Sequence, residues 1–213
     1  MTQPKRILTA LALALAVATP ALAGPPLLCH PFDIGTAKSL PWDGRGGWAQ
    51  GQAGYPITQL VGDTEAILQR GTAVLVRMET LRRAAIYASQ DPAVASALVD
   101  RLSAKARASQ PGDALAALDA AYLIEALHQV TMTGPNGEFR DRIAGVARVI
   151  AEREARPFVA QAVQARPSDP AVAFAAALIT MGRDKQAYGV YATRARAGVS
   201  QDALLARNIN HLS

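Results

Sequence analysis

Apolar residues recur every three or four positions from about residue 58 onward, and this spacing restricts the chain to helices. Ile143, Val146 and Ile150, for example, follow one another at intervals of 3 and 4 residues. Such intervals place side chains on one face of an α-helix. No stretch alternates apolar and polar residues as a half-buried strand does. The sequence therefore predicts a single all-α domain over residues 58–213.

Capping residues and prolines mark the starts of the expected helices. Asp91-Pro92 and Asp169-Pro170 each place an N-cap aspartate before a proline at the first helical position. TGPNG at 133–137 is a turn. These signals predict seven to eight antiparallel helices joined by short turns. Their expected starts lie at or just after Thr72, Asp91, Asp113, Gly137, Pro157, Asp169, Lys185 and Ser200, and Ser200 is expected to cap the last of them.

One short motif occurs twice, which raises the question of helical repeats. Asp-Pro-Ala-Val-Ala stands at 91–95 and at 169–173, 78 residues apart. Two units of about 39 residues would suit stacked helical hairpins such as TPR or HEAT repeats. Asp-Pro-Ala is also a frequent helix opening, and the residues between 113 and 151 do not reproduce the unit. An irregular array or bundle is favoured, with a repeat-like array as the alternative.

The first 23 residues are typical of a cleaved secretion signal. Lys5 and Arg6 precede an apolar run of 11 residues, and Ala-Leu-Ala ends the segment. This order of basic, apolar and small residues is that of a signal peptide cut before Gly24. The run is shorter than the roughly 20 residues that a membrane-spanning helix needs. We expect export to the periplasm or the extracellular space.

The mature chain is expected to be a soluble protein of 190 residues with a small positive charge. Loss of Lys5 and Arg6 lowers the formal net charge from +5 to +3. No run of five or more basic residues occurs, which argues against nucleic acid as a partner. No second apolar run reaches membrane length, so we expect no integral membrane segment after the signal.

Residues 24–57, the leader, differ from the helical domain in composition. The leader is rich in Gly and Pro, yet it holds four of the eleven aromatic residues of the chain. One interpretation is an extended strap that fills a groove between helices with Phe32, Ile34, Leu40 and Trp42. The other is a Gly-rich loop that presents Trp42, Trp48 and Arg45 to a ligand. The gain from burying large apolar side chains favours the strap.

Cys29 is the only cysteine, and its place behind the signal invites a chemical role. Lipidation would call for a small residue before it, and Leu28 is bulky. A zinc site needs about four ligands at paired spacings, which Cys29 and His30 do not supply, so no metal is assigned. A buried free thiol is favoured. A disulfide-linked dimer and a metal or catalytic role are the alternatives.

Two apolar segments carry charges that must be paired if they are buried. Asp119 and Glu125 stand in ALAALDAAYLIEALHQV, and Arg82 and Arg83 stand in VRMETLRRAAIYAS. Because an unpaired buried charge is costly, we expect these arginines to pair with these carboxylates across neighbouring helices. Glu79 and Arg83 are expected to form a further pair within their own helix.

The same residues also allow a catalytic interpretation. Glu125 and His128 have the E-x-x-H spacing of di-iron bundles, but such sites need the motif twice and the chain has it once. Asp119 and Glu125 would lie about 9 Å apart along a helix, at the upper limit for a pair of carboxylates that activates water. A structural network is therefore favoured, and no catalytic residue is assigned.

Three segments carry a resemblance to known proteins: CHPFDIGTAKSLPW, RMETLRRAAIYA and LAALDAAYLIEAL. Together they resemble a family of uncharacterised exported bacterial helical proteins. The resemblance covers most of the mature chain and supports export. It implies no activity.

These observations predict an exported interaction module that binds a protein, a peptide or a small ligand, without a cofactor. A helical groove or the tryptophan-bearing leader would form its binding surface. The alternative is an enzyme with a site between leader and helices, in which Asp119 and Glu125 act with Arg82 or Arg83. A Cys29-linked dimer or metal carrier is a third hypothesis.

Overall fold

The computed structural model describes residues 25–45, 47–109, 114–133 and 139–212, so the expected signal peptide lies outside the described residues. The described part forms nine α-helices and no strand, which confirms the all-α class. The helices are α1 (Leu60–Ile67), α2 (Val74–Ala88), α3 (Pro92–Ala108), α4 (Ala114–Met132), α5 (Phe139–Ile150), α6 (Arg156–Ala165), α7 (Pro170–Thr180), α8 (Lys185–Ala197) and α9 (Ala203–Asn208).

Aspartate side chains cap four of these helices at their N-termini. Asp91 accepts a hydrogen bond from the Ala93 N–H, and Asp169 accepts from two backbone N–H groups at the start of α7, as expected. Asp202 caps α9, so the prediction that Ser200 caps this helix is wrong. Asp113 and most of the turn at 133–137 lie outside the described residues.

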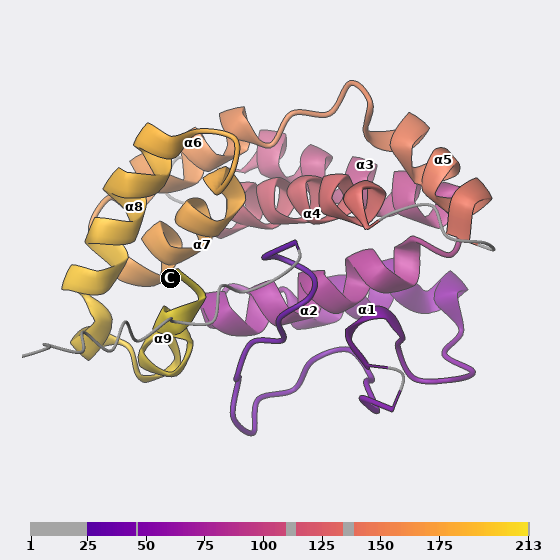
Figure 1. Ribbon diagram of the computed structural model, residues 1–213, viewed down its shortest axis with the longest axis horizontal. Helices are drawn as coiled ribbons and strands as arrows, with labels where there is room; N and C mark the ends of the chain where they lie inside the picture. Colours follow the sequence, from indigo (N-terminus) through magenta and orange to yellow (C-terminus); the bar gives the residue numbers. More distant parts are fainter. Residues whose placement is uncertain (1–24, 46, 110–113, 134–138, 213) are drawn as a thin grey trace, which may run out of the picture.

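Helix α4 lies at the centre of the molecule. It packs against α2, α3, α5, α6 and α7. Figure 1 shows α5 near one end of it and α7 and α8 near the other. A repeat array would let each unit contact only its neighbours. The arrangement around α4 is therefore that of an irregular bundle. No helix in the described part combines the length and the apolar character needed to span a membrane.

Helix α1 is the one helix that the sequence did not predict. It has eight residues and contains Gly62, so its intrinsic helical preference is low. Tertiary contacts stabilise it instead. Leu60 and Thr64 are buried, and Arg77 of α2 donates hydrogen bonds to the backbone carbonyls of Leu68 and Gln69 just after α1 ends.

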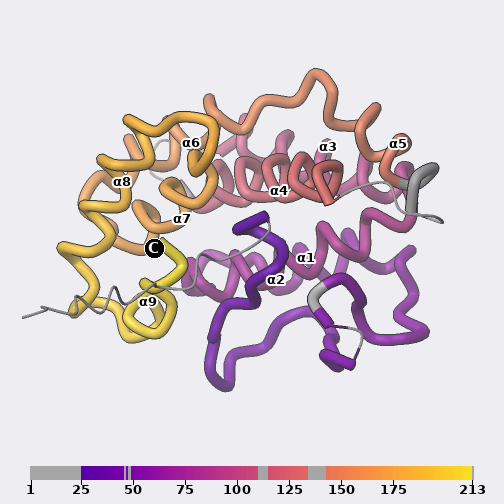
Figure 2. Tube along the Cα trace, in the orientation of Figure 1, coloured from indigo at the N-terminus to yellow at the C-terminus, as the bar shows by residue number. Residues whose placement is uncertain are grey.

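The leader is an extended strap that docks into the helical bundle. Phe32, Ile34 and Leu40 are buried in the common core, as the strap interpretation expects. The N–H group of Phe32 donates to Glu79 Oε2 on α2, at 3.0 Å. Figure 2 shows the strap starting between α2 and α4 and then looping out around α2.

The start of the strap is also fixed by α4. The Leu27 N–H donates to Gln129 Oε1 at 2.8 Å, and the Tyr122 hydroxyl donates to the Leu27 carbonyl at 3.1 Å. Backbone groups of an extended segment need such partners because no ladder of a sheet satisfies them. The strap is therefore an integral part of the bundle.

The C-terminal residues hold the strap from the other side. Asn208 of α9 accepts a hydrogen bond from the Asp33 N–H at 2.8 Å and donates one to the Asp33 carbonyl at 2.9 Å. The His211 ring stacks on Phe32, with ring centroids 4.8 Å apart. Two segments from opposite ends of the described chain thus complete one part of the core.

Candidate functional site

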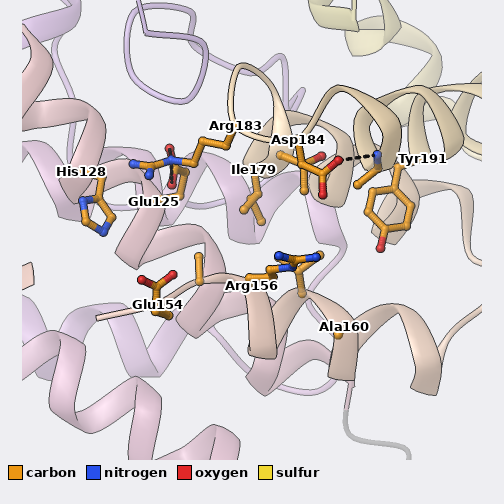
Figure 3. Close-up of a pocket in the computed structure, with 13 residues that line it drawn as sticks. Glu125, His128, Glu154, Arg156, Ala160, Ile179, Arg183, Asp184 and Tyr191 are labelled. Carbon is orange, nitrogen blue, oxygen red and sulfur yellow. Dashed lines mark hydrogen bonds and ion pairs between the residues drawn. The ribbon is translucent and has the colours of Figure 1, made fainter. Parts of the chain in front are cut away.

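A pocket of about 430 Å³ opens between α4, α6, α7 and α8 (Figure 3). Its polar side chains come from five places: α4, the segment before α6 with the first turn of that helix, the end of α7, the α7–α8 turn, and α8. The charged or polar residues of the lining are Glu125, His128, Glu154, Arg156, Thr180, Arg183, Asp184 and Tyr191.

Glu125 is the buried acid of the pocket. Its side chain is 4% exposed and pairs with the Arg183 guanidinium, with Arg183 Nε 2.9 Å from Oε2. Burial raises the pKa of the Glu125 carboxyl, and the contacts with Arg183 and Gln129 offset only part of that effect. Burial therefore outweighs the ion pair at Glu125, because the Arg183 side chain is 52% exposed and shares its charge with water.

Arg183 reaches Glu125 from the short turn between α7 and α8. Gly182 precedes it with φ of +82°, a conformation that other residues rarely adopt. The glycine lets the chain reverse within the turn and still bring Arg183 over the pocket. Asp184 follows and caps α8 by accepting a hydrogen bond from the Ala187 N–H.

His128 stands one turn after Glu125 on the same side of α4. Its Nε2 lies 3.1 Å from the backbone carbonyl of Arg153, in the segment before α6. When Nε2 carries the proton, this contact is a hydrogen bond that fixes the imidazole at the end of the pocket. Figure 3 shows His128, Glu125 and Arg183 along one side.

Glu154 and Arg156 lie on the facing side. Both side chains are exposed and line the pocket, and Figure 3 shows both pointing into it. Neither forms a hydrogen bond or an ion pair with another described residue. They are two opposite charges, two residues apart, that are available to a ligand.

The apolar residues of the lining form what we call the floor of the pocket. Ala155, Val159 and Ile179 are buried and Ala160 is exposed, and Figure 3 shows the half-buried Tyr191 at one end of the pocket. A concave site that combines apolar surface with convergent polar groups is typical of small-molecule binding.

The buried network expected from the sequence exists, but with other partners. Arg77, not Arg82 or Arg83, pairs with Asp119 across α2 and α4, at 2.6 Å. Glu125 pairs with Arg183. The predicted pairing of Arg82 or Arg83 with these two carboxylates is wrong, because both arginines turn toward Glu79 on their own helix.

Glu79 is the centre of that second network. Arg82 Nε lies 2.8 Å from its carboxylate and Arg83 Nε lies 2.7 Å from it, which confirms the expected Glu79–Arg83 pair. Arg82 and Arg83 also donate to the strap carbonyls of Leu28 and Leu40. The network therefore anchors the strap to α2.

The leader residues predicted to contact a ligand are placed as follows. Trp42 is half-buried, with the Arg82 guanidinium 4.8 Å from its ring centroid and Tyr87 packed edge-on against it. Arg45 is exposed, and its N–H donates to Asp43. The side chain of Trp48 lies outside the described residues. A ligand role for these residues stays a prediction, and the contacts of Trp42 favour the strap.

Cys29 is a half-buried free thiol on the strap. Burial raises its pKa, an effect that nearby Arg82 reduces. The strap and the C-terminus bring His30 to 6.2 Å from His211, measured between ring centroids. No group of three or more His, Cys, Asp or Glu side chains in the described part is placed to hold a metal ion.

Sequence reasoning missed Glu154, Arg156 and Arg183. Each of them looks like an ordinary surface charge beside a turn. The one available signal was that the turn Met181–Gly182–Arg183–Asp184 follows the most apolar helix, so its charges had to lie at the edge of the core. No known protein family, curated protein or solved structure matches the chain. The pocket itself is therefore the basis for a function.

Proposed function

We propose that this chain is an exported binding protein that holds a small ligand in the pocket between α4, α6, α7 and α8. The observation that carries the proposal is the pair Glu154 and Arg156, two charges without a partner among the described residues that point into an apolar-floored cavity. Its volume of about 430 Å³ lies within the range typical of ligand sites.

The rigidity of the walls supports binding. Glu125 and His128 stand on the central helix, and each is fixed by a contact with a neighbouring segment. Walls fixed in this way lose little conformational entropy when a ligand binds. The structure thus supports a preformed site.

The enzyme alternative uses two carboxylates, and only one of them, Glu125, lines the pocket. Asp119 does not line the pocket, and its side chain is 1% exposed and held by both ends of the Arg77 guanidinium. Glu125 remains, and its raised pKa is a property that general acids share. A proton-transfer enzyme that uses Glu125 is therefore the second candidate function.

Filling the pocket tests the proposal. Ala160→Trp would place an indole inside the cavity, whereas Ala104→Trp adds the same group on an exposed site of α3. Both variants and the wild type would be incubated with the small-molecule fraction of the exporting host's medium and measured by native mass spectrometry. We expect a bound small molecule on the wild type and on A104W, and its loss on A160W.

The same spectra separate the hypotheses. If no small molecule distinguishes A160W from A104W, the binding proposal is wrong. If the ligand's mass changes on incubation, and Glu125→Gln stops that change while binding is kept, the enzyme is the correct function. A mass starting at Gly24 would support the signal peptide, and a reducible dimer would support the Cys29 hypothesis.

A further inference from the structure

We propose that the ligand of this pocket is a short peptide with free ends, its carboxylate bound by Arg156 and its ammonium group by Glu154. This inference rests on the proposed function and names its ligand class. It follows from the balance of charge in the pocket, from the placement of the two unpartnered residues, and from the apolar floor beside them.

The lining charges nearly cancel. The pocket holds the two guanidiniums of Arg156 and Arg183 and three carboxylates, those of Glu125, Glu154 and Asp184. With His128 counted as neutral, its formal charge is −1. Arg183 and Glu125 neutralise each other, and Asp184 caps α8. One positive and one negative group remain for a ligand.

This balance disfavours ligands of a single charge. Inorganic phosphate bound by Arg156 would leave Glu154 without a partner in a pocket of formal charge −1, and a polyamine bound by Glu154 would leave Arg156 without a partner. A hydrocarbon would remove Glu154 and Arg156 from water without giving them partners, which is costly. A zwitterion supplies a partner for each.

The spacing of the two groups favours a peptide over a free amino acid. No ion pair within 4.0 Å joins Glu154 and Arg156, although both are free of other partners among the described residues. Figure 3 shows the two charged ends apart from each other along one side of the pocket. An extended chain spans up to about 3.5 Å per residue, so a peptide of two or three residues holds its ammonium and carboxylate groups further apart than a free amino acid does.

The floor of the pocket would receive a side chain of the peptide. Val159 and Ile179 are buried residues of the lining, and Figure 3 shows Tyr191 at the Asp184 end of the pocket. An aliphatic side chain placed there would leave water for an apolar surface. We therefore expect a preference for peptides with one aliphatic residue, such as Ala-Leu.

Capped peptides and charge-removing variants together test the inference. Isothermal titration calorimetry would measure the Kd of Ala-Leu, its N-acetyl form and its C-terminal amide for the wild type, Arg156→Gln and Glu154→Gln. Because a charge-assisted hydrogen bond contributes roughly 1.4 kcal/mol or more, each change should weaken binding by about tenfold or more. Arg148→Gln and Glu152→Gln, exposed residues outside this pocket, are the matched controls and should bind Ala-Leu like the wild type.

The decisive result is which charge-removing variant becomes insensitive to which modification of the peptide ends. Amidation should weaken binding to the wild type and to E154Q but not to R156Q. Acetylation should weaken binding to the wild type and to R156Q but not to E154Q. The inference is overturned if R156Q and E154Q bind Ala-Leu as tightly as the wild type. It is also overturned if acetylation and amidation change the Kd of the two variants as they change that of the wild type.

Two further probes separate this inference from the function it rests on. Spermidine and inorganic phosphate would be titrated into the wild type, A160W and A104W. If either binds in a way that A160W abolishes, and Ala-Leu does not bind, the peptide inference fails and the binding function stands. If none of the probes, nor any molecule of the host medium, distinguishes A160W from A104W, both fail.

Discussion

Arg77 and Asp119 form a bidentate ion pair that joins α2 to the central helix α4. Arg77 Nε lies 2.8 Å from Oδ1 and Nη2 lies 2.6 Å from Oδ2. Both side chains are almost fully buried. The remaining donors of the guanidinium bind the carbonyls of Leu68 and Gln69, so a single side chain links α1, α2 and α4.

Removal of one partner of this pair should destabilise the fold strongly. Arg77→Met leaves the Asp119 carboxylate buried without its main partner, and we expect a loss of about 3–5 kcal/mol in the free energy of unfolding. Urea titration followed by circular dichroism measures it. The double variant Arg77→Met/Asp119→Leu removes both charges and should recover most of the loss. A single-variant cost below about 1 kcal/mol would contradict this account.

Two glycines in helices should respond to alanine in opposite ways. A Cβ on Gly145 of α5 would clash with Pro92 Cγ of α3, whereas a Cβ on Gly189 of α8 meets no atom within 4 Å. Gly145→Ala should therefore cost about 1–3 kcal/mol through overpacking. Gly189→Ala should stabilise by about 0.5–1 kcal/mol through lower chain entropy. Thermal unfolding of both variants would show the contrast, and equal shifts would refute it.

His211 should make the protein less stable in mild acid. Burial lowers its pKa from 6.5 to about 4, His30 adds to this effect, and Glu79 opposes it. Between these two values the unfolded chain binds a proton that the folded chain does not, so stability falls as the pH falls from 6.5 to 4. Because the ring is only partly buried, we expect the free energy of unfolding to fall by about 1–2 kcal/mol over this pH range.

The variant His211→Phe isolates this contribution. Phenylalanine keeps the stacking on Phe32 and has no titratable group in this range. The free energy of unfolding would be measured for both proteins from pH 7 to pH 4, and the difference between them reports His211 together with its coupling to His30 and Glu79. The wild type should lose stability more steeply than H211F, and parallel curves would show that His211 contributes nothing.

Glu125 should have the opposite dependence on pH. Its pKa is raised by burial, so the folded chain holds a proton that the unfolded chain releases above the ordinary glutamate pKa of 4.5. The wild type then loses stability relative to Glu125→Gln as the pH rises from 4.5 through the raised pKa. Urea titrations at several pH values between 4 and 8 measure this difference. If the wild type instead gained stability relative to Glu125→Gln as the pH rose over that range, the raised pKa of Glu125 would be contradicted.

The helices were predictable wherever a local signal specified them. Asp91 and Asp169 cap α3 and α7 through hydrogen bonds to backbone groups two or three residues away. Such contacts depend only on neighbours in sequence. Helix α1 was not predictable in this way, because Leu60 is buried by other elements and Arg77 binds the carbonyls that follow the helix.

The site was predictable only in part, because its partners meet through the fold. The sequence indicated that buried Glu125 needs a cation, and the structure supplies one. That cation, Arg183, stands 58 residues away. Which arginine meets which carboxylate depends on the rotation and register of packed helices, and no local pattern specifies these. Glu154 and Arg156 acquire their importance only from the cavity they face.

The hydrogen bonds between Asp33 of the strap and Asn208 of α9 can form only after the whole chain between them has been synthesised. A ribosome makes Asp33 early, yet its hydrogen-bond partner Asn208 lies 175 residues further along the chain. Until those last residues exist, Phe32 lacks the His211 ring that stacks on it. Contacts of such long sequence separation form late and slowly, because a large loop must close first. The residues of the strap are thus among the first described residues to be synthesised and among the last that can form their native contacts.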